Sequence, residues 1–188
     1  MSLFSTLFHR EATPPDRTTD ILNRHLTGDF RVFPLAERKC TVSEVREIGK
    51  NVGVAFSPEI IAHLCGQFPG IYIEAREEIW PRPKAYDVAP FWSFLYAIHT
   101  YTAASKSDDW MRLDYAASEF QKNTGIIAAP VLSIKGDANV YCVDANSKLV
   151  RFDHELNTVE PVSLGFFELL EREVSDLCNR TERKKNNG

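Results

Sequence analysis

The last third of the chain constrains the fold most, because short apolar runs alternate there with tight polar turns. Four strands are expected, at 131–134, 140–143, 149–152 and 158–162. The joints between them are rich in Asp, Asn, Ser and Gly, which adopt the backbone conformations that tight turns require. Connections this short join only antiparallel neighbours. The sequence therefore predicts an antiparallel meander in this region.

The meander needs a cover, because each of its larger apolar side chains gains roughly 1.5–3 kcal/mol on burial. A helix capped by Ser163 is expected to follow it, and its apolar flank would pack on the sheet. The meander side chains that need this cover are Val140, Cys142, Leu149, Val150 and Phe152.

The front of the chain is expected to be helical. Thr41 and Glu44 fit a capping box that opens one helix, which Gly49 and Gly53 close. Ser57 and Pro58 fit the start of a second helix. Before this helical pair, Asp20 is expected to cap a short helix over 21–27. The segment 30–39 is expected to be irregular, because Pro34 would break a helix.

Strand spacing appears at Ile71–Ala75, with a continuation expected through 77–80. The apolar run 90–104 fits either a buried strand or a buried helix, and its aromatic and Thr content favours a strand. A helix over 110–123 is expected next, capped from within Ser107–Asp109 and ended at Gly125.

These elements predict a single α+β domain. It has an antiparallel sheet, an N-terminal helical pair, an inserted helix and a C-terminal helix packed on the sheet. Residues 1–40 are expected to form an N-terminal extension with a Pro14–Pro15 linker, 41–180 the domain, and 181–188 a polar tail that frays. The length of 188 residues suits one core, and 44% apolar content is ordinary for a globular protein.

Charge and cysteine content narrow the function classes. A net charge of −4 argues against a nucleic-acid binder, which usually carries a basic face. No window approaches the ~18 apolar residues of a membrane span, and the start of the chain lacks a signal-peptide pattern. The four cysteines are scattered without a CxxC pair, which favours reduced thiols in a cytoplasmic protein: Cys40, Cys65, Cys142 and Cys178.

No pattern for catalysis, a metal or a cofactor stands out. Glu74, Glu77 and Glu78 fit a solvated surface, and Asp108 and Asp109 fit helix capping. The acids of the meander fit turn chemistry better than a calcium loop. None of the five histidines forms an HExxH pattern: His9, His25, His63, His99 and His154. His99 fits a hydrogen-bonded core residue.

Trp80-Pro-Arg-Pro83 is the clearest candidate for binding. Two prolines hold the backbone extended, and Trp and Arg are enriched at interface hot spots. The competing interpretation places Trp80 in the core. Trp80, Arg82 and the turn carrying Asp137 and Asn139 are the predicted contacts with a protein partner.

The sequence resembles the SUKH superfamily, which contains fungal glucan-synthesis regulators and many bacterial immunity proteins. The likeness covers about 41–180. It is carried by GDANVYCVDANSKLVRFDHE at 136–155, by SLGFFELLERE at 163–173 and by SPEIIAHLCGQFPG at 57–70. The long segment between Trp80 and Gly125 departs from the family pattern.

The resemblance implies a binding protein without catalysis. An immunity-type protein that neutralises a cognate toxin is the first expectation, and a scaffold in a regulatory assembly is the second. An enzyme with a pocket near Trp92 and His99 is the third, with His99 and Asp153 as the residues to mutate. The sequence leaves the oligomeric state open.

Overall fold

The computed structural model describes residues 16–84 and 90–186. These residues form one seven-stranded antiparallel sheet in the order β1-β2-β3-β4-β5-β6-β7, so every strand pairs with its neighbour in sequence. The predicted α+β fold is confirmed, and the meander extends over the whole sheet. The strands are β1 (Phe30–Pro34), β2 (Ile71–Ala75), β3 (Ala97–Thr100), β4 (Ala128–Ile134), β5 (Asn139–Asp144), β6 (Leu149–Asp153) and β7 (Thr158–Pro161).

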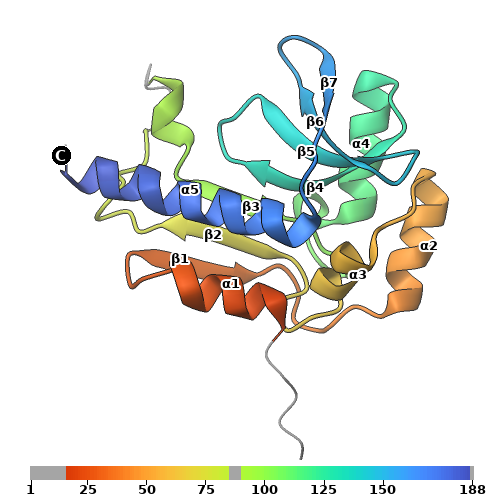
Figure 1. Cartoon of the computed structure of the whole chain (residues 1–188), viewed down its shortest axis with the longest axis horizontal. Coiled ribbons are helices and arrows are strands. Elements are labelled where there is room, and N and C mark those ends of the chain that lie inside the picture. The colour runs from red at the N-terminus through yellow and green to blue at the C-terminus, as the bar shows by residue number, and fades with distance from the viewer. Residues whose placement is uncertain (1–15, 85–89, 187–188) are drawn as a thin grey trace, which may run out of the picture.

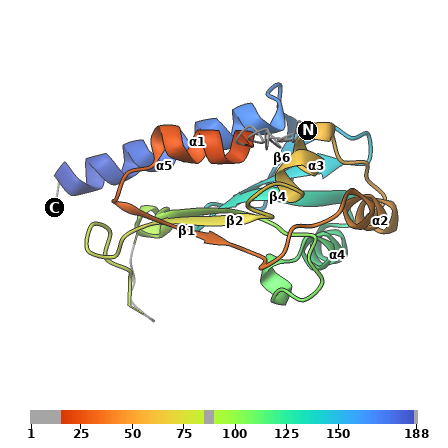
Figure 2. The ribbon, with the colours of Figure 1, turned by 90° about the horizontal axis from the view of Figure 1, so that it is seen from below.

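The helices divide between the two faces of the sheet. In the same described ranges they are α1 (Arg17–His25), α2 (Val42–Val52), α3 (Pro58–Leu64), α4 (Leu113–Thr124) and α5 (Phe166–Asn186), with two 3₁₀ helices, η1 (Phe91–Phe94) and η2 (Asp109–Met111). Helices α1 and α5 run side by side over one face (Figure 1). Helix α4 lies on the opposite face, under β4 (Figure 2).

The main core lies between the sheet and the helices α1, α3 and α5. Ile73 and Ile98 pair across β2 and β3 and are almost fully buried. Leu169, Leu170 and Val174 of α5 are fully buried in the same core. Elements before residue 40 contribute as well, since Ile21 and Leu22 of α1 and Phe30 of β1 lie in this core.

A second, smaller core lies under α4, and it corrects one expectation. Val140, Cys142, Val150 and Phe152 share the face that α4 covers, where Phe120 stacks edge-on against Phe152 at 5.0 Å. The C-terminal helix packs on the opposite face, so it is not their cover. The strand register puts these side chains on one face, but only the tertiary structure decides which helix reaches that face. Of the predicted set, only Leu149 packs against the main core.

The predicted helix caps are confirmed where the capping residue lies within one turn of the helix. Thr41 and Glu44 form the expected capping box, and Gly53 ends α2 in the left-handed region. The Ser57 hydroxyl caps α3, whose first residue is Pro58. Gly125 ends α4 in the same way as Gly53 ends α2.

Three other helix starts differ from the prediction. Helix α1 begins at Arg17 and not after Asp20, because the Asp16 carboxylate accepts from the amides of Thr19 at 2.8 Å and Gln67 at 2.5 Å. Helix α4 begins at Leu113 without a side-chain cap, since the residues before it form η2.

Helix α5 begins at Phe166, three residues after Ser163. Its early amides are bonded by glutamates: Gly165 donates to Glu168, and Phe167 donates to Glu59 of α3. At its other end the helix continues to Asn186, so residues 181–186 are not a frayed tail. The buried Thr181 and an ion pair of 3.0 Å between Lys185 and Asp29 hold this end against the fold.

Two further predictions are wrong in the middle of the chain. Residues 30–34, expected to be irregular, form the edge strand β1, because Phe30 and Val32 pack on the core and Pro34 falls at the end of the strand. Residues 77–80 turn instead of extending β2, with the amides of Ile79 and Trp80 both bonded to the carbonyl of Arg76. The strand expected within 90–104 is confirmed over Ala97–Thr100, and 91–94 is 3₁₀ helix.

A buried polar chain ties α1 and α3 to the sheet. The two ring nitrogens of His63 lie 2.8 Å from the hydroxyls of Thr18 and Thr100. The Thr100 oxygen also accepts from the amide of Ile71 at 3.0 Å. Because His63 is almost fully buried, its pKa falls from 6.5 to about 4, and the ring is neutral near pH 7.

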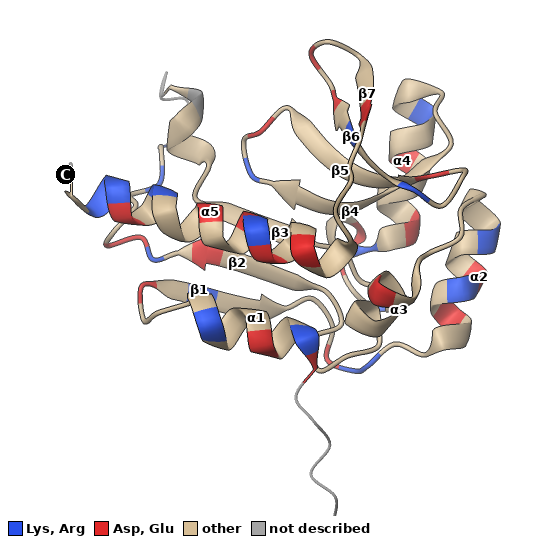
Figure 3. Cartoon of the chain, in the orientation of Figure 1, with Lys and Arg blue, Asp and Glu red and all other residues tan. Residues whose placement is uncertain are grey.

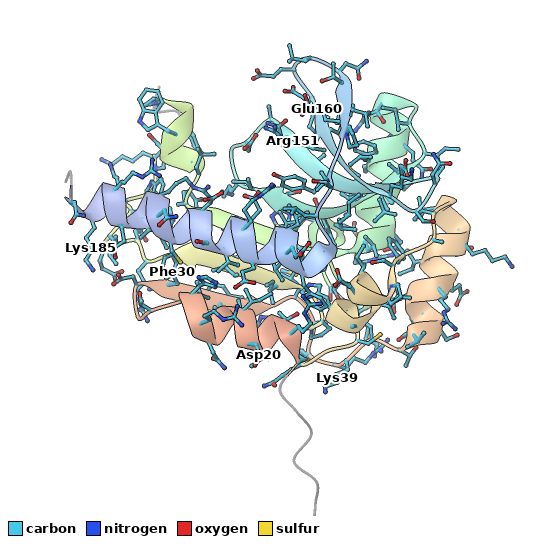
Figure 4. All side chains as sticks on the ribbon, in the orientation of Figure 1. Asp20, Phe30, Lys39, Arg151, Glu160 and Lys185 are labelled. Atoms are coloured by element: carbon cyan, nitrogen blue, oxygen red, sulfur yellow. The ribbon has the colours of Figure 1, made fainter. Side chains whose placement is uncertain are left out.

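Charged residues occur along the helices and in the turns between elements (Figure 3). Figure 3 shows both signs along α2 and α5. Among the strands, Arg151 of β6 and Glu160 of β7 face each other across the far edge of the sheet, 3.9 Å apart (Figure 4). The sheet surface next to β1 carries a different set of residues, which form the candidate site.

Candidate binding site on the open face of the sheet

Among residues 16–84 and 90–186, no α-helix lies over half of one sheet face. We call this surface the open face: the side of β1, β2 and β3 that points away from α1 and α5. Helix α4 covers the same side only from β4 onward (Figure 2). On the edge strand, Phe33 is 43% exposed.

The strand register places a row of rings across the open face. Phe33 pairs with Tyr72, Tyr72 with His99, and His99 with Ser133. Residues directly opposite each other in antiparallel strands share one face. The ring centroids of Phe33 and Tyr72 lie 6.2 Å apart, and those of Tyr72 and His99 lie 6.3 Å apart. Tyr101 closes the row, with its ring 5.1 Å from His99 and its hydroxyl 2.8 Å from that of Ser133.

Trp110 lies against the middle of this row. Its ring lies edge-on to Tyr72 at 6.2 Å and to His99 at 6.1 Å, within the range of favourable aromatic pairs. The loop around it is fixed by backbone hydrogen bonds, from Thr102 to Met111 at 2.8 Å and from Leu113 to Thr102 at 2.9 Å. Trp110 is nevertheless 49% exposed, so an ordered backbone presents a large apolar ring to the surroundings.

The rings line a hollow of about 580 Å³. This volume lies within the usual range for small-ligand sites, roughly 300–1,000 Å³. A second hollow of about 320 Å³ lies on the other side of Trp110, beside α4. The first hollow is lined by Phe33, Pro34, Leu35, Tyr72, His99, Trp110, Met111 and Lys135.

The polar groups of the first hollow are largely neutral. Burial, together with the nearby charge of Lys135, lowers the pKa of His99 to about 4, so the imidazole carries no charge near pH 7. Burial and the neighbouring Glu74 carboxylate raise the pKa of Tyr72 above its ordinary value. Tyr101 lies next to His99 but outside this lining, and burial raises the pKa of Tyr101 to about 12. Lys135 is therefore the charged residue of the lining.

Two of the predicted partner contacts lie at the end of β2. Trp80 is buried, and its indole donates to the carbonyl of Ser93 at 3.1 Å, which agrees with the core interpretation. Arg82 is held in place: it donates to the Trp80 carbonyl at 2.8 Å, pairs with Glu74 at 3.1 Å and stacks 3.7 Å from the centre of the Tyr96 ring. Trp80 therefore positions Arg82 and offers little surface of its own.

The other two predicted contacts, Asp137 and Asn139, line the second hollow together with Trp110. The Asp137 carboxylate accepts from the amide of Asn139 at 2.8 Å and from its side chain at 2.6 Å, which is the expected turn chemistry. The structure thus brings Asp137 and Asn139 to the border of the aromatic row. Their role in partner binding remains a prediction.

The residues suggested for an enzyme are not gathered in one place. His99 lines the first hollow, but neither Trp92 nor Asp153 does. The Asp153 carboxylate accepts from the amides of Glu155 and Leu156 in a turn. Within residues 16–84 and 90–186, no cluster of three or more His, Cys, Asp or Glu side chains could hold a metal ion. No helix in those ranges is long and apolar enough to cross a membrane.

Sequence reasoning named only His99 as a site candidate among the residues that line the hollow, and it missed the other rings and the charge: Phe33, Tyr72, Trp110 and Lys135. The alternation of Ile71, Tyr72 and Ile73 was the available signal, because it puts Tyr72 on the face opposite the core. Comparisons with protein families, with curated proteins and with solved structures found no match to this chain. The resemblance to the SUKH superfamily therefore stays a prediction.

Proposed function

We propose that the chain is a protein-binding module that receives its partner on the open face, and that the partner is a toxin neutralised by this binding. The observation that carries the proposal is the cluster of rings on the open face, of which two are well exposed. Phe33 and Trp110 are 43% and 49% exposed, although rigid strands and a pinned loop hold them.

Such rings suit the centre of an interface. Aromatic residues are enriched at hot spots, where a few side chains provide most of the binding energy. Their rigid placement also limits the conformational entropy lost on binding. A partner that covered the two hollows and the sheet between them could form an interface of standard size, about 800 Å² on each side.

The class of partner comes from the sequence resemblance and not from the site. Immunity proteins of the SUKH superfamily bind a cognate toxin and block it. A scaffold in a regulatory assembly is the alternative, and it would use the same surface with a different partner.

The test is a neutralisation assay with the product of the adjacent gene. That product is expressed with the wild-type chain or with Phe33→Ala, Trp110→Ala or Leu156→Ala. Leu156 is the matched control, because it is 71% exposed and lies in the turn between β6 and β7, outside both hollows.

We expect the wild-type chain and Leu156→Ala to restore growth, and Trp110→Ala to restore it poorly although the variant stays folded. Equal protection by Trp110→Ala and Phe33→Ala would exclude the open face as the docking surface. The scaffold alternative would be favoured if the product of the adjacent gene did not inhibit growth and the chain formed a stable complex with signalling or envelope-synthesis proteins.

A further inference from the structure

The first hollow combines an aromatic lining with one unpaired positive charge. Lys135 follows β4, and its backbone amide donates to the carbonyl of Ala97 at 2.9 Å, which fixes the base of the side chain. Its ammonium lies 5.7 Å from the centre of the Tyr96 ring. Within the part of the chain that the structure describes, this ammonium has no carboxylate partner.

Arg31 of β1 lies on the open face opposite Glu74 in the register, outside the lining of the first hollow. Two other charges nearby cancel each other. Glu74 and Arg82, which border the same face, pair with each other at 3.1 Å, and their side chains are only 17% and 20% exposed. His99 is neutral, for the reason given above. A ligand in the hollow therefore meets Lys135 as the one charged residue of the lining, beside an apolar, ring-lined surface.

His99 adds an unused polar group. Its ring contacts Tyr72, Tyr101 and Trp110, but among the described residues its nitrogens make no hydrogen bond. A neutral imidazole has one donor and one acceptor nitrogen. A ligand that lies against the row of rings can thus gain one hydrogen bond from His99 in addition to its contact with Lys135.

We propose that the partner's anchor in this hollow is an aromatic side chain with a carboxylate beside it: the ring lies among Phe33, Tyr72 and Trp110, and the carboxylate pairs with Lys135. This inference rests on the proposed function, since it names the chemistry of the segment that docks on the open face. Groups of rings also attract cations, but Lys135 would repel a cationic anchor and so selects against it.

Two small probes test the charge without the partner. N-acetyl-L-phenylalanine carries the ring and a carboxylate, whereas N-acetyl-L-phenylalaninamide carries the same ring and is neutral. Binding is followed by ¹⁹F NMR of the full chain labelled with 5-fluorotryptophan, and Trp110→Phe identifies the Trp110 signal. An exposed ion pair contributes up to ~1 kcal/mol, so the acid should bind about fivefold more tightly than the amide.

Lys135→Gln should remove this preference and leave the affinity for the amide unchanged. Lys148→Gln is the matched control. Lys148 is an exposed lysine in the turn that follows β5, whereas Lys135 lies in the turn that precedes β5. The control variant should keep the fivefold preference.

The possible outcomes separate this inference from the proposed function. The acid and the amide could bind equally, and the shift that each causes in the Trp110 signal could be lost in Phe33→Ala. This result would overturn the carboxylate anchor and leave aromatic docking in place. Shifts that leave Trp110 unaffected, or no binding of either probe, would also overturn the inference. The neutralisation assay then decides the proposed function independently.

Discussion

Acid should destabilise this protein through His63. The ring is buried between Thr18 and Thr100, and burial holds its pKa near 4 in the folded chain, against 6.5 for the ordinary side chain. Between these two values the unfolded chain binds a proton that the folded chain does not. Stability is therefore complete above pH 6.5, falls as the pH drops toward 4, and changes no further from this group below that.

The magnitude follows from the shift. Each pKa unit corresponds to ~1.4 kcal/mol, so the full loss across the window is about 3 kcal/mol. At pH 5, between the two pKa values, the linkage relation gives a loss of about 2 kcal/mol relative to pH 7. This is a large part of the ~5–15 kcal/mol that stabilises a typical domain.

The assay is urea unfolding at pH 7 and pH 5 for the wild-type chain and for His63→Gln. The variant should be less stable than the wild type at both pH values, because it disturbs the two hydrogen bonds. From pH 7 to pH 5, however, its free energy of unfolding should fall by about 2 kcal/mol less than that of the wild type. His99→Gln serves as a comparison, since the pKa of His99 is also about 4 and the same arithmetic applies. Equal losses in the wild type and in His63→Gln would refute the reasoning.

Three stability predictions can be checked by thermal or urea unfolding. Thr41→Ala removes half of the capping box with Glu44 and should lower the free energy of unfolding by about 1 kcal/mol. Circular dichroism should show that this variant keeps the wild-type helix content. Gly70→Ala should cost about 1–3 kcal/mol, because φ is +82° and a Cβ would lie 2.6 Å from the carbonyl oxygen of Tyr101; an unchanged midpoint would mean that this turn relaxes freely. Phe152→Ala should cost about 3–5 kcal/mol, since it empties the core under α4, and a loss below ~1 kcal/mol would show that α4 packs loosely.

The parts of the fold that the sequence predicted are those with local causes. The caps at Thr41 and Ser57 and the glycine after α2 act within one turn of chain, so their residue types are sufficient evidence. The same holds for the meander, where the turn residues fix the connection and the connection fixes the pairing.

The errors have non-local causes. β1 was missed because an edge strand is stabilised by pairing with β2, some forty residues later in the chain. Asp16 caps α1 and at the same time holds the amide of Gln67, a partnership that a local pattern cannot show.

The candidate site was hidden for the same reason. Phe33, Tyr72 and His99 become neighbours only through the register of three strands that are far apart in sequence. Trp110 reaches them from a loop whose position depends on hydrogen bonds to the segment after β3. Sequence reasoning found Asp137 and Asn139 because they form a turn, and they border the site only after folding.

The two outermost strands have a consequence for assembly. A sheet with exposed edges and a bare apolar surface invites other chains to add strands to it. Both edges of this sheet oppose that: Pro34 and Pro161, which have no N–H to donate, stand at the last positions of β1 and β7. The charged Arg31 and Glu160 lie on the same two strands, exposed to solvent. Another protein can thus still bind through the side chains of the open face, whereas the edge strands disfavour the addition of further strands and the growth of a fibre.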